Sequence, residues 1–306
     1  FTANGGVAFV TEDGTLAEWR DGRWRTRVLS LPGRATSLYA LGPGRFLIAV
    51  VEPLMGQRSY ITRVEGAAVV TTAIPGDRYV SSIVGDGAND LWALGGRAPL
   101  RWDGAQWVEG AALPGNPLLA TMVRTGPGEL LILESWGSGS GYGRLHRYRD
   151  GAYTLVYDFR QLELRVEGPI VARGNSLWLR GWDSARSRGS LVHFNGATWE
   201  AYNLPPGADS ANIMGVGDAV WAVYGSRAWR REGNSWVPVE GFTGRQYGTI
   251  LGAPDGTVWD FSNGVARRQG DTWTSFGEGS VPTLGFLHDA PAAPALGTVG
   301  APGVLV

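Results

Sequence analysis

Cysteine and lysine are both missing from the 306-residue sequence, and histidine occurs only three times. Without cysteine the chain can form no disulfide, no thiolate metal site and no thiol nucleophile. No apolar run approaches the roughly 20 residues that a transmembrane helix requires, so no membrane-spanning segment is expected. The net charge of -1 provides no general attraction to nucleic acid. Helical periodicity is also scarce, because Gly or Pro interrupts nearly every window.

The sequence is instead rich in glycine and tryptophan, with 47 and 14 residues, and both recur in register. In residues 90–108, two short apolar runs are followed by Asp103-Gly104, a dipeptide typical of a tight turn. Equivalent turn glycines, each preceded by a polar residue and followed by a large apolar one, are Gly22, Gly66, Gly104, Gly151, Gly196, Gly233 and Gly270. Repeats of about 40 residues with four short strands each are typical of β-propeller blades.

We therefore predict an all-β fold, a β-propeller of seven four-stranded blades, with eight blades as the alternative. In the third repeat the strands are expected near residues 80–84, 91–94, 100–102 and 107–111. The first repeat has no room for an innermost strand at its start, and residues 283–287 are expected to supply it. Pairing of N- and C-terminal strands would protect edges that otherwise aggregate. Residues 1–290 then form one domain, and residues 291–306 form a tail or degenerate extra strands.

The repeat pattern Leu-Trp-Ala…Arg-Trp-Asp-Gly-x-x-Trp is clearest in residues 90–108, 176–200 and 219–237. It resembles the tryptophan-rich propeller repeats of secreted and surface proteins of myxobacteria and their relatives. More distantly it is similar to the propeller repeats of two-component sensor ectodomains. The resemblance implies an extracellular, periplasmic or cell-surface setting and a binding or scaffold role. It carries no shared catalytic residues.

Loop length distinguishes the two faces of the predicted propeller. Turns between first and second strands, and between third and fourth strands, are short and uniform, whereas loops on the other face vary. Binding residues usually lie on long loops of a rigid scaffold, so we expect the site on the variable face near blades four and five. The variable loops are residues 52–58, 134–143, 158–167, 181–188 and 241–248. The candidate ligand-binding residues are Trp136, Tyr142, Arg160, Trp182, Asp183, Arg186, Arg188, Arg245 and Tyr247.

The candidate residues suggest two kinds of contact. Trp136 and Trp182 fall outside the repeat, where an indole can stack on a sugar ring, and the arginines can hold a carboxylate or phosphate. A solvated loop face is the alternative interpretation. The recurring tryptophans instead fit packing between blades; they are Trp92, Trp107, Trp178, Trp199, Trp221, Trp236, Trp259 and Trp273. His146 and His193 are expected to be ordinary residues of third strands, because their spacing matches no metal motif.

These observations favour a non-enzymatic binding or scaffold propeller without cofactor, metal or catalytic residues. A protein is the first expected partner and a glycan the second. One alternative is a Ca²⁺-dependent hydrolase of lactones or phosphoesters with a metal in the channel. Its candidate acids, Asp86, Asp218, Asp255 and Asp289, follow innermost strands, where aspartate also stabilises turns by itself. Another alternative is a sensor or assembly subunit of a larger complex, because the sequence starts at Phe1 and ends within a strand-like pattern.

Overall fold

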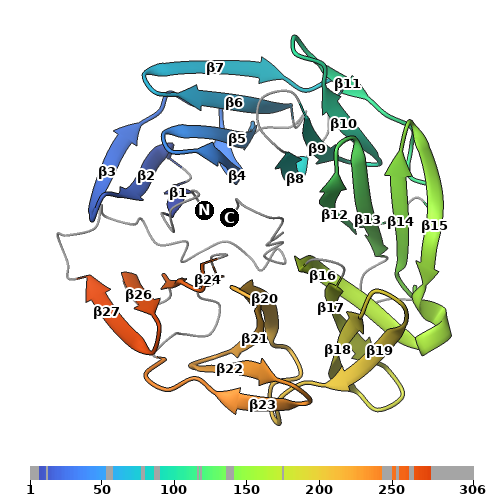
Figure 1. The fold of residues 1–306 in the computed structure, drawn as a ribbon. Coiled ribbons are helices and arrows are strands. Elements are labelled where there is room, and N and C mark those ends of the chain that lie inside the picture. The colour runs from blue at the N-terminus through green and yellow to red at the C-terminus, as the bar shows by residue number, and fades with distance from the viewer. Residues whose placement is uncertain are drawn as a thin grey trace.

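The computed structural model describes residues 7–11, 13–52, 58–76, 80–85, 90–115, 117, 119–135, 141–173, 176–242, 250–252, 255–261 and 265–276. Its strands form seven antiparallel sheets, which follow one another around a central axis as the blades of a β-propeller (Figure 1). Neighbouring innermost strands contact each other from blade two to blade seven. The prediction of an all-β propeller with seven blades is therefore confirmed.

Blades one to three contain the following strands. Blade one has β1 (Ala8–Val10), β2 (Thr15–Arg20) and β3 (Arg23–Val28). Blade two has β4 (Arg34–Gly42), β5 (Arg45–Val51), β6 (Ser59–Glu65) and β7 (Ala68–Ala73). Blade three has β8 (Val80–Gly85), β9 (Leu91–Gly95), β10 (Ala98–Trp102) and β11 (Trp107–Glu109).

The remaining strands belong to blades four to seven. Blade four has β12 (Leu119–Gly126), β13 (Glu129–Ser135), β14 (Arg144–Arg149) and β15 (Ala152–Asp158), and the 3₁₀ helix η1 (Phe159–Leu162) follows it. Blade five has β16 (Leu164–Arg173), β17 (Ser176–Asp183), β18 (Arg188–Phe194) and β19 (Trp199–Asn203). Blade six has β20 (Asn212–Val216), β21 (Ala219–Tyr224), β22 (Arg227–Glu232) and β23 (Ser235–Pro238). Blade seven has β24 (Ile250–Gly252), β25 (Val258–Asp260), β26 (Val265–Gln269) and β27 (Thr272–Phe276).

The sheet of blade one contains three described strands, whereas each other sheet contains four. Because β1 contacts β4 in the way that other second strands contact the next blade, β1 corresponds to a second strand, as predicted. The expected innermost strand at residues 283–287 lies outside the described residues, as does the proposed tail at residues 291–306.

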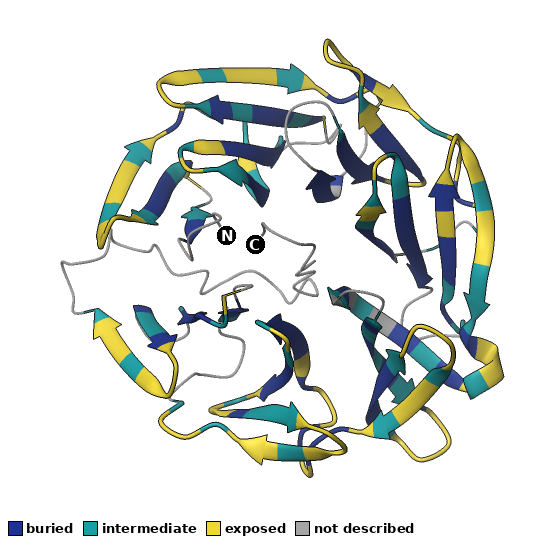
Figure 2. Cartoon of the chain, viewed as in Figure 1, coloured by how far each residue is buried: buried dark blue, intermediate teal, exposed yellow. Residues whose placement is uncertain are grey.

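Burial decreases from the axis to the rim of the propeller. The second strand β9 is completely buried, whereas the outermost strands β3 and β7 alternate between exposed and half-buried residues (Figure 2). The core consists of apolar clusters between neighbouring sheets, such as the cluster between blades three and four around Trp92 and Met122. A twisted sheet leaves a wedge beside its neighbour, and wide indole rings fill that wedge. The recurring tryptophans therefore pack between blades, as predicted.

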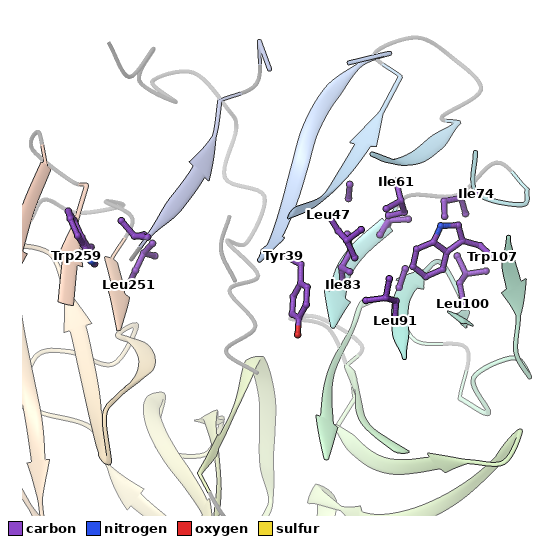
Figure 3. Close-up of a cluster of buried hydrophobic side chains, with 14 of the residues drawn as sticks. Tyr39, Leu47, Ile61, Ile74, Ile83, Leu91, Leu100, Trp107, Leu251 and Trp259 are labelled. Carbon is purple, nitrogen blue, oxygen red and sulfur yellow. The ribbon is translucent and has the colours of Figure 1, made fainter. Parts of the chain in front are cut away.

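Six aromatic rings join blade one to blade seven. They are Phe9, Trp19 and Trp24 from blade one and Trp259, Phe261 and Phe276 from blade seven. The fully buried Trp259 ring meets the rings of Trp19 and Trp24 edge to face, with both centroids at 5.6 Å. Trp259 also stacks on Phe276 at 5.7 Å. Figure 3 shows Trp259 beside Leu251, across from the part of this cluster that fills the contact between blades two and three.

A partly buried ion pair joins blade three to blade four, on the face where the turns are short and uniform. Asp90 accepts hydrogen bonds from the Arg124 side chain at 2.7 Å, from the Trp92 indole at 2.9 Å and from the Gly128 backbone at 3.3 Å. Burial alone would raise the pKa of Asp90, but these hydrogen bonds outweigh it and hold the pKa below its ordinary value. The Asp90 carboxylate therefore fixes the end of the β8–β9 connection of blade three against the β12–β13 turn of blade four.

Trp259→Ala is expected to destabilise the protein by about 3–5 kcal/mol, the usual loss for a fully buried large aromatic side chain. Urea unfolding followed by circular dichroism measures this loss. Trp273→Ala in the same blade is the matched control, and its loss should be smaller because Trp273 is half-buried. Equal losses in the two variants would contradict a special role for the contact between blades one and seven.

Asp90→Asn is expected to cost about 1–3 kcal/mol of unfolding free energy at pH 7, because charge-assisted hydrogen bonds from Arg124 and two N–H groups are weakened. An aspartate with a lowered pKa in the folded state stabilises the protein above the unfolded pKa of about 4. The difference between wild type and variant should therefore shrink as the pH falls through the folded pKa. Asp150→Asn, whose side chain is 90% exposed, should change stability little at any pH.

Candidate functional site

Strand order places the β17–β18 turn and the η1 connection on the same face of the propeller, because both follow strands that run in the same direction. We call this surface the β17–β18 face; it is the face that the sequence predicts to be variable. The loop expected at residues 181–188 in blade five is shorter in the structure, because β17 continues to Asp183 and β18 begins at Arg188. The expected loop at residues 158–167 is also partly ordered, because it contains η1 and the start of β16.

Local side-chain bonds form the η1 connection between blades four and five. The Asp158 carboxylate accepts a hydrogen bond from the backbone N–H of Arg160 at 3.0 Å and so caps the helix. Glu163 ends it in a left-handed conformation with φ 55°. Phe159 is fully buried against Tyr157 and Trp199, and it anchors the connection to the cluster between the two blades.

The β17–β18 turn is fixed by Asp183. Its carboxylate accepts from the Arg186 backbone N–H at 3.0 Å and from the Arg186 guanidinium at 2.9 Å. The backbone hydrogen bond, followed by the guanidinium, holds the pKa of Asp183 below its ordinary value, against the opposite effect of desolvation. The Asp183 side chain is 11% exposed whereas that of Arg186 is 68% exposed, so the pair stands at the surface of the turn.

A pocket of about 230 Å³ lies between this turn and the η1 connection. It is lined by residues of η1, the β17–β18 turn and the adjoining strands: Leu162, Glu163, Leu164, Asp183, Ala185, Arg186, Arg188, Ser190, Ala201, Tyr202 and Asn203. The Nε atom of Arg188 is buried and has no hydrogen-bond partner. The pocket therefore combines the Asp183 carboxylate paired with Arg186, a second carboxylate at Glu163, the Arg188 guanidinium, and leucine and alanine side chains.

The structure brings together three of the nine candidate residues, because Asp183, Arg186 and Arg188 all line this pocket. Tyr142 and Arg160 are described but do not line it. Trp182 belongs to β17, where it pairs with Arg165 and Gly189, so its expected place in a loop is wrong. Adjacent strand residues point to opposite faces of a sheet, so Trp182 lies on the side away from Asp183 and the pocket. Trp136, Arg245 and Tyr247 lie outside the described residues.

Sequence reasoning missed an aromatic cage around Arg231 between blades five and six. The guanidinium carbon lies 4.0 Å from the Tyr202 ring, 5.5 Å from Trp178 and 5.8 Å from Trp236. His193 stacks on Trp178 at 3.5 Å, and both of its ring nitrogens are buried without a partner. Burial and the nearby Arg231 charge lower the pKa of His193, which favours a neutral ring. The cage is a packing contact between blades, which agrees with the ordinary strand role expected for His193.

A second missed contact is the Glu134–His146 pair within blade four, between strands β13 and β14. The Glu134 Oε2 and His146 Nε2 atoms are 3.1 Å apart, and Glu134 also accepts from the Gly115 backbone at 3.2 Å. The Glu134 side chain is completely buried and that of His146 is 6% exposed. An acid and a base in hydrogen-bond contact resemble part of a catalytic site, but a substrate cannot reach groups buried this deeply. Glu134 was expected in a loop and instead belongs to β13.

A channel metal site needs several converging acids. Within the described ranges, no three His, Asp or Glu side chains come close enough together to hold a metal ion. Asp218 and Asp255 lie in turns, and Asp255 accepts from the Thr257 backbone N–H at 2.9 Å, as expected for a turn-stabilising residue. Asp86 and Asp289 lie outside the described residues. Among the described helices, none has the length and hydrophobicity needed to cross a membrane.

Three solved structures resemble this chain in fold, although their sequences are distant. YCF48 from Cyanidioschyzon merolae matches with a TM-score of 0.58 and 15% identity over 81% of this chain and 87% of that one. BBS1N, solved in complex with ARL6DN, matches with a TM-score of 0.53 and 14% identity over 84% of each chain. The extracellular domain of the hybrid two-component system BT4673 from B. thetaiotaomicron matches with a TM-score of 0.51 and 11% identity, over 91% of this chain and 47% of that one. These similarities establish the fold.

No protein-family model matches the chain. No curated protein matches it either. The expected similarity to sensor ectodomains is thus found at the level of fold, through the BT4673 domain.

Gly189→Ala is expected to destabilise the site, because a Cβ atom there would overlap the Asp209 carbonyl oxygen and crowd the Leu204 side chain. The same loop is held by a hydrogen bond from the Gly189 N–H to the Asp209 carboxylate at 3.1 Å. Thermal unfolding should show a lower midpoint for this variant. Gly126→Ala, which meets no atom within 4 Å, is the matched control and should unfold like wild type. If Gly189→Ala unfolds at the wild-type midpoint, the Gly189 backbone does not lie tightly against the Asp209 carbonyl in solution.

Proposed function

We propose that this chain is a non-enzymatic binding or scaffold propeller that holds a protein partner on its β17–β18 face. The observation that carries the proposal is the pocket beside η1, which the Arg188 guanidinium lines without an ion pair to a described residue. An arginine without an internal ion pair can bind an acidic group of another molecule without first breaking a contact inside the protein. Asp183 and Arg186 hold the turn in place, which reduces the entropy lost on binding.

The chemistry of the described residues supports binding rather than turnover. Among the described residues, the Glu134–His146 pair in blade four resembles an acid–base dyad, and both of its side chains are buried. Pocket residues present two guanidiniums, two carboxylates, two hydroxyls and an amide, but no histidine that could relay a proton. Such a set suits recognition through hydrogen bonds and ion pairs.

Two of the similar structures are consistent with this proposal. BBS1N was solved in complex with a protein, ARL6DN, so a propeller of this general form can hold a protein partner. The BT4673 match is an extracellular domain, and we extend that setting to this chain as part of the proposal, so that the protein works outside the cytoplasm or at the cell envelope.

Site-specific photo-crosslinking tests the proposed face. A benzophenone amino acid at Ala185, an exposed residue of the β17–β18 turn, should capture a protein of defined mass from an extract of the source organism. The matched control places the same amino acid at Ala105, which is exposed in a turn of the opposite face. The Ala185 product should disappear with excess unlabelled protein and weaken in Asp183→Asn, which releases the turn.

Two results would count against this function. One is equal capture from Ala185 and Ala105, which indicates contact without a preferred face. The other is metal-dependent turnover of a lactone, phosphoester or glycoside by the purified protein, which favours the hydrolase alternative.

A further inference from the structure

We infer that the pocket beside η1 recognises a single carboxylate group, which the Arg188 guanidinium binds. This inference rests on the proposed function, because it specifies the chemical group that a partner presents to the same site.

The pocket charges divide into a paired set and an unpaired guanidinium. Asp183 is satisfied by Arg186, whose backbone and side chain both donate to it. Arg188 forms no ion pair with a described residue, and its buried Nε donates to nothing. A guanidinium offers parallel N–H donors whose spacing matches the two oxygens of a carboxylate. The Arg188 guanidinium, which lines the pocket without an ion pair to a described residue, can therefore bind an anionic acceptor from outside.

The other lining residues favour a carboxylate over a phosphate. Glu163 and Asp183 place two negative charges around the pocket, so a doubly charged phosphate meets more repulsion there than a singly charged carboxylate. The hydroxyl of Ser190 and the amide of Asn203 lie in the same lining and can donate to the second carboxylate oxygen. The two guanidiniums and two carboxylates of the lining sum to zero charge, so a carboxylate is held by its direct hydrogen bonds to Arg188 and not by a net positive field.

Size and apolar residues limit what carries the carboxylate. A volume of about 230 Å³ accommodates one side chain or one sugar ring rather than a larger ligand. Leu162, Leu164 and Ala201 provide apolar contact for methylene groups. An aspartate or glutamate side chain and a sugar acid share this chemistry, and the experiment below distinguishes the two sources.

Strand pairing fixes Arg188 where it can act. Arg188 is the first residue of β18 and lies directly opposite Asp183 of β17. The next residue, Gly189, is held against the Asp209 loop by a hydrogen bond at 3.1 Å. The guanidinium thus projects from a rigid strand end rather than from a free loop, as a selective site requires.

The Arg188 Nε–H resonance in proton–nitrogen NMR spectra provides a direct test on the full-length protein. The acidic probes are N-acetyl-L-glutamate methylamide and methyl β-D-glucuronide. Their neutral counterparts are N-acetyl-L-glutamine methylamide and methyl β-D-glucoside. We expect at least one acidic probe to shift the Arg188 resonance saturably in the millimolar range, and each neutral probe to bind about tenfold or more weakly, as expected when a charge-assisted hydrogen bond is lost.

The variants separate a binding role of Arg188 from a structural one. Arg188→Gln should weaken binding of the acidic probe by about tenfold, and Arg188→Lys should retain part of it because the charge remains without the planar fork. For these variants, binding is followed through the Arg186 resonance at the same pocket. Arg23→Gln, at an exposed arginine of β3, should bind like wild type. Circular dichroism confirms that each variant is folded.

Each outcome has a defined meaning. Preference for the glutamate probe assigns the carboxylate to a protein side chain, and preference for the glucuronide assigns it to a sugar acid. Equal binding of acidic and neutral probes, no saturable shift with either acid, or unchanged binding by Arg188→Gln overturns the inference. If the Ala185 crosslink survives while the acids fail to bind, the carboxylate inference is wrong but the proposed function stands. Acid binding without any crosslinked protein overturns the protein-partner function instead.

Discussion

The structure depends on filling the wedge between neighbouring twisted sheets. Each sheet buries its second strand between its neighbours, and the space there suits a wide, flat side chain better than an aliphatic one. Trp92, Trp221 and Trp259 are nearly or fully buried at equivalent positions of three blades. Where blade seven meets blade one, the Trp259 ring meets the Trp19 and Trp24 rings across the wedge.

This constraint determines which residues remain available for function. A side chain that recurs at one blade position is used for packing, so the indoles of the repeat are poor candidates for ligand stacking. Functional groups are left for positions where a blade departs from the repeat. In blade five these are η1, which precedes the blade, and the β17–β18 turn that Asp183 fixes. The pocket lies between η1 and the β17–β18 turn, and it forms without any change in the packed sheets.

The periodic features were predictable from sequence, because a turn glycine and a following tryptophan report local geometry that repeats in every blade. Blade number, strand positions in the third repeat and the packing role of the repeated tryptophans follow from that periodicity. Trp182 was misplaced because a strand that continues beyond its usual length has no local marker. The Glu134–His146 pair depends on a distance across two strands, which the spacing of residues does not report. Of the candidate site, Asp183, Arg186 and Arg188 were found because they are charged residues within one turn.

Two arginines illustrate why composition alone could not locate the site. Arg231 and Arg188 are both partly buried, and each has a guanidinium nitrogen without a hydrogen-bond partner. Arg231 is nevertheless enclosed by Trp178, Tyr202 and Trp236 from two blades, so its charge is stabilised by aromatic faces and is closed to a ligand. Arg188 instead borders a pocket at the surface of one blade. The difference lies in which residues surround each guanidinium. The aromatic rings around Arg231 come together only when blades five and six pack. A charged residue in this propeller is therefore assigned to structure or to recognition by its neighbours across the wedge.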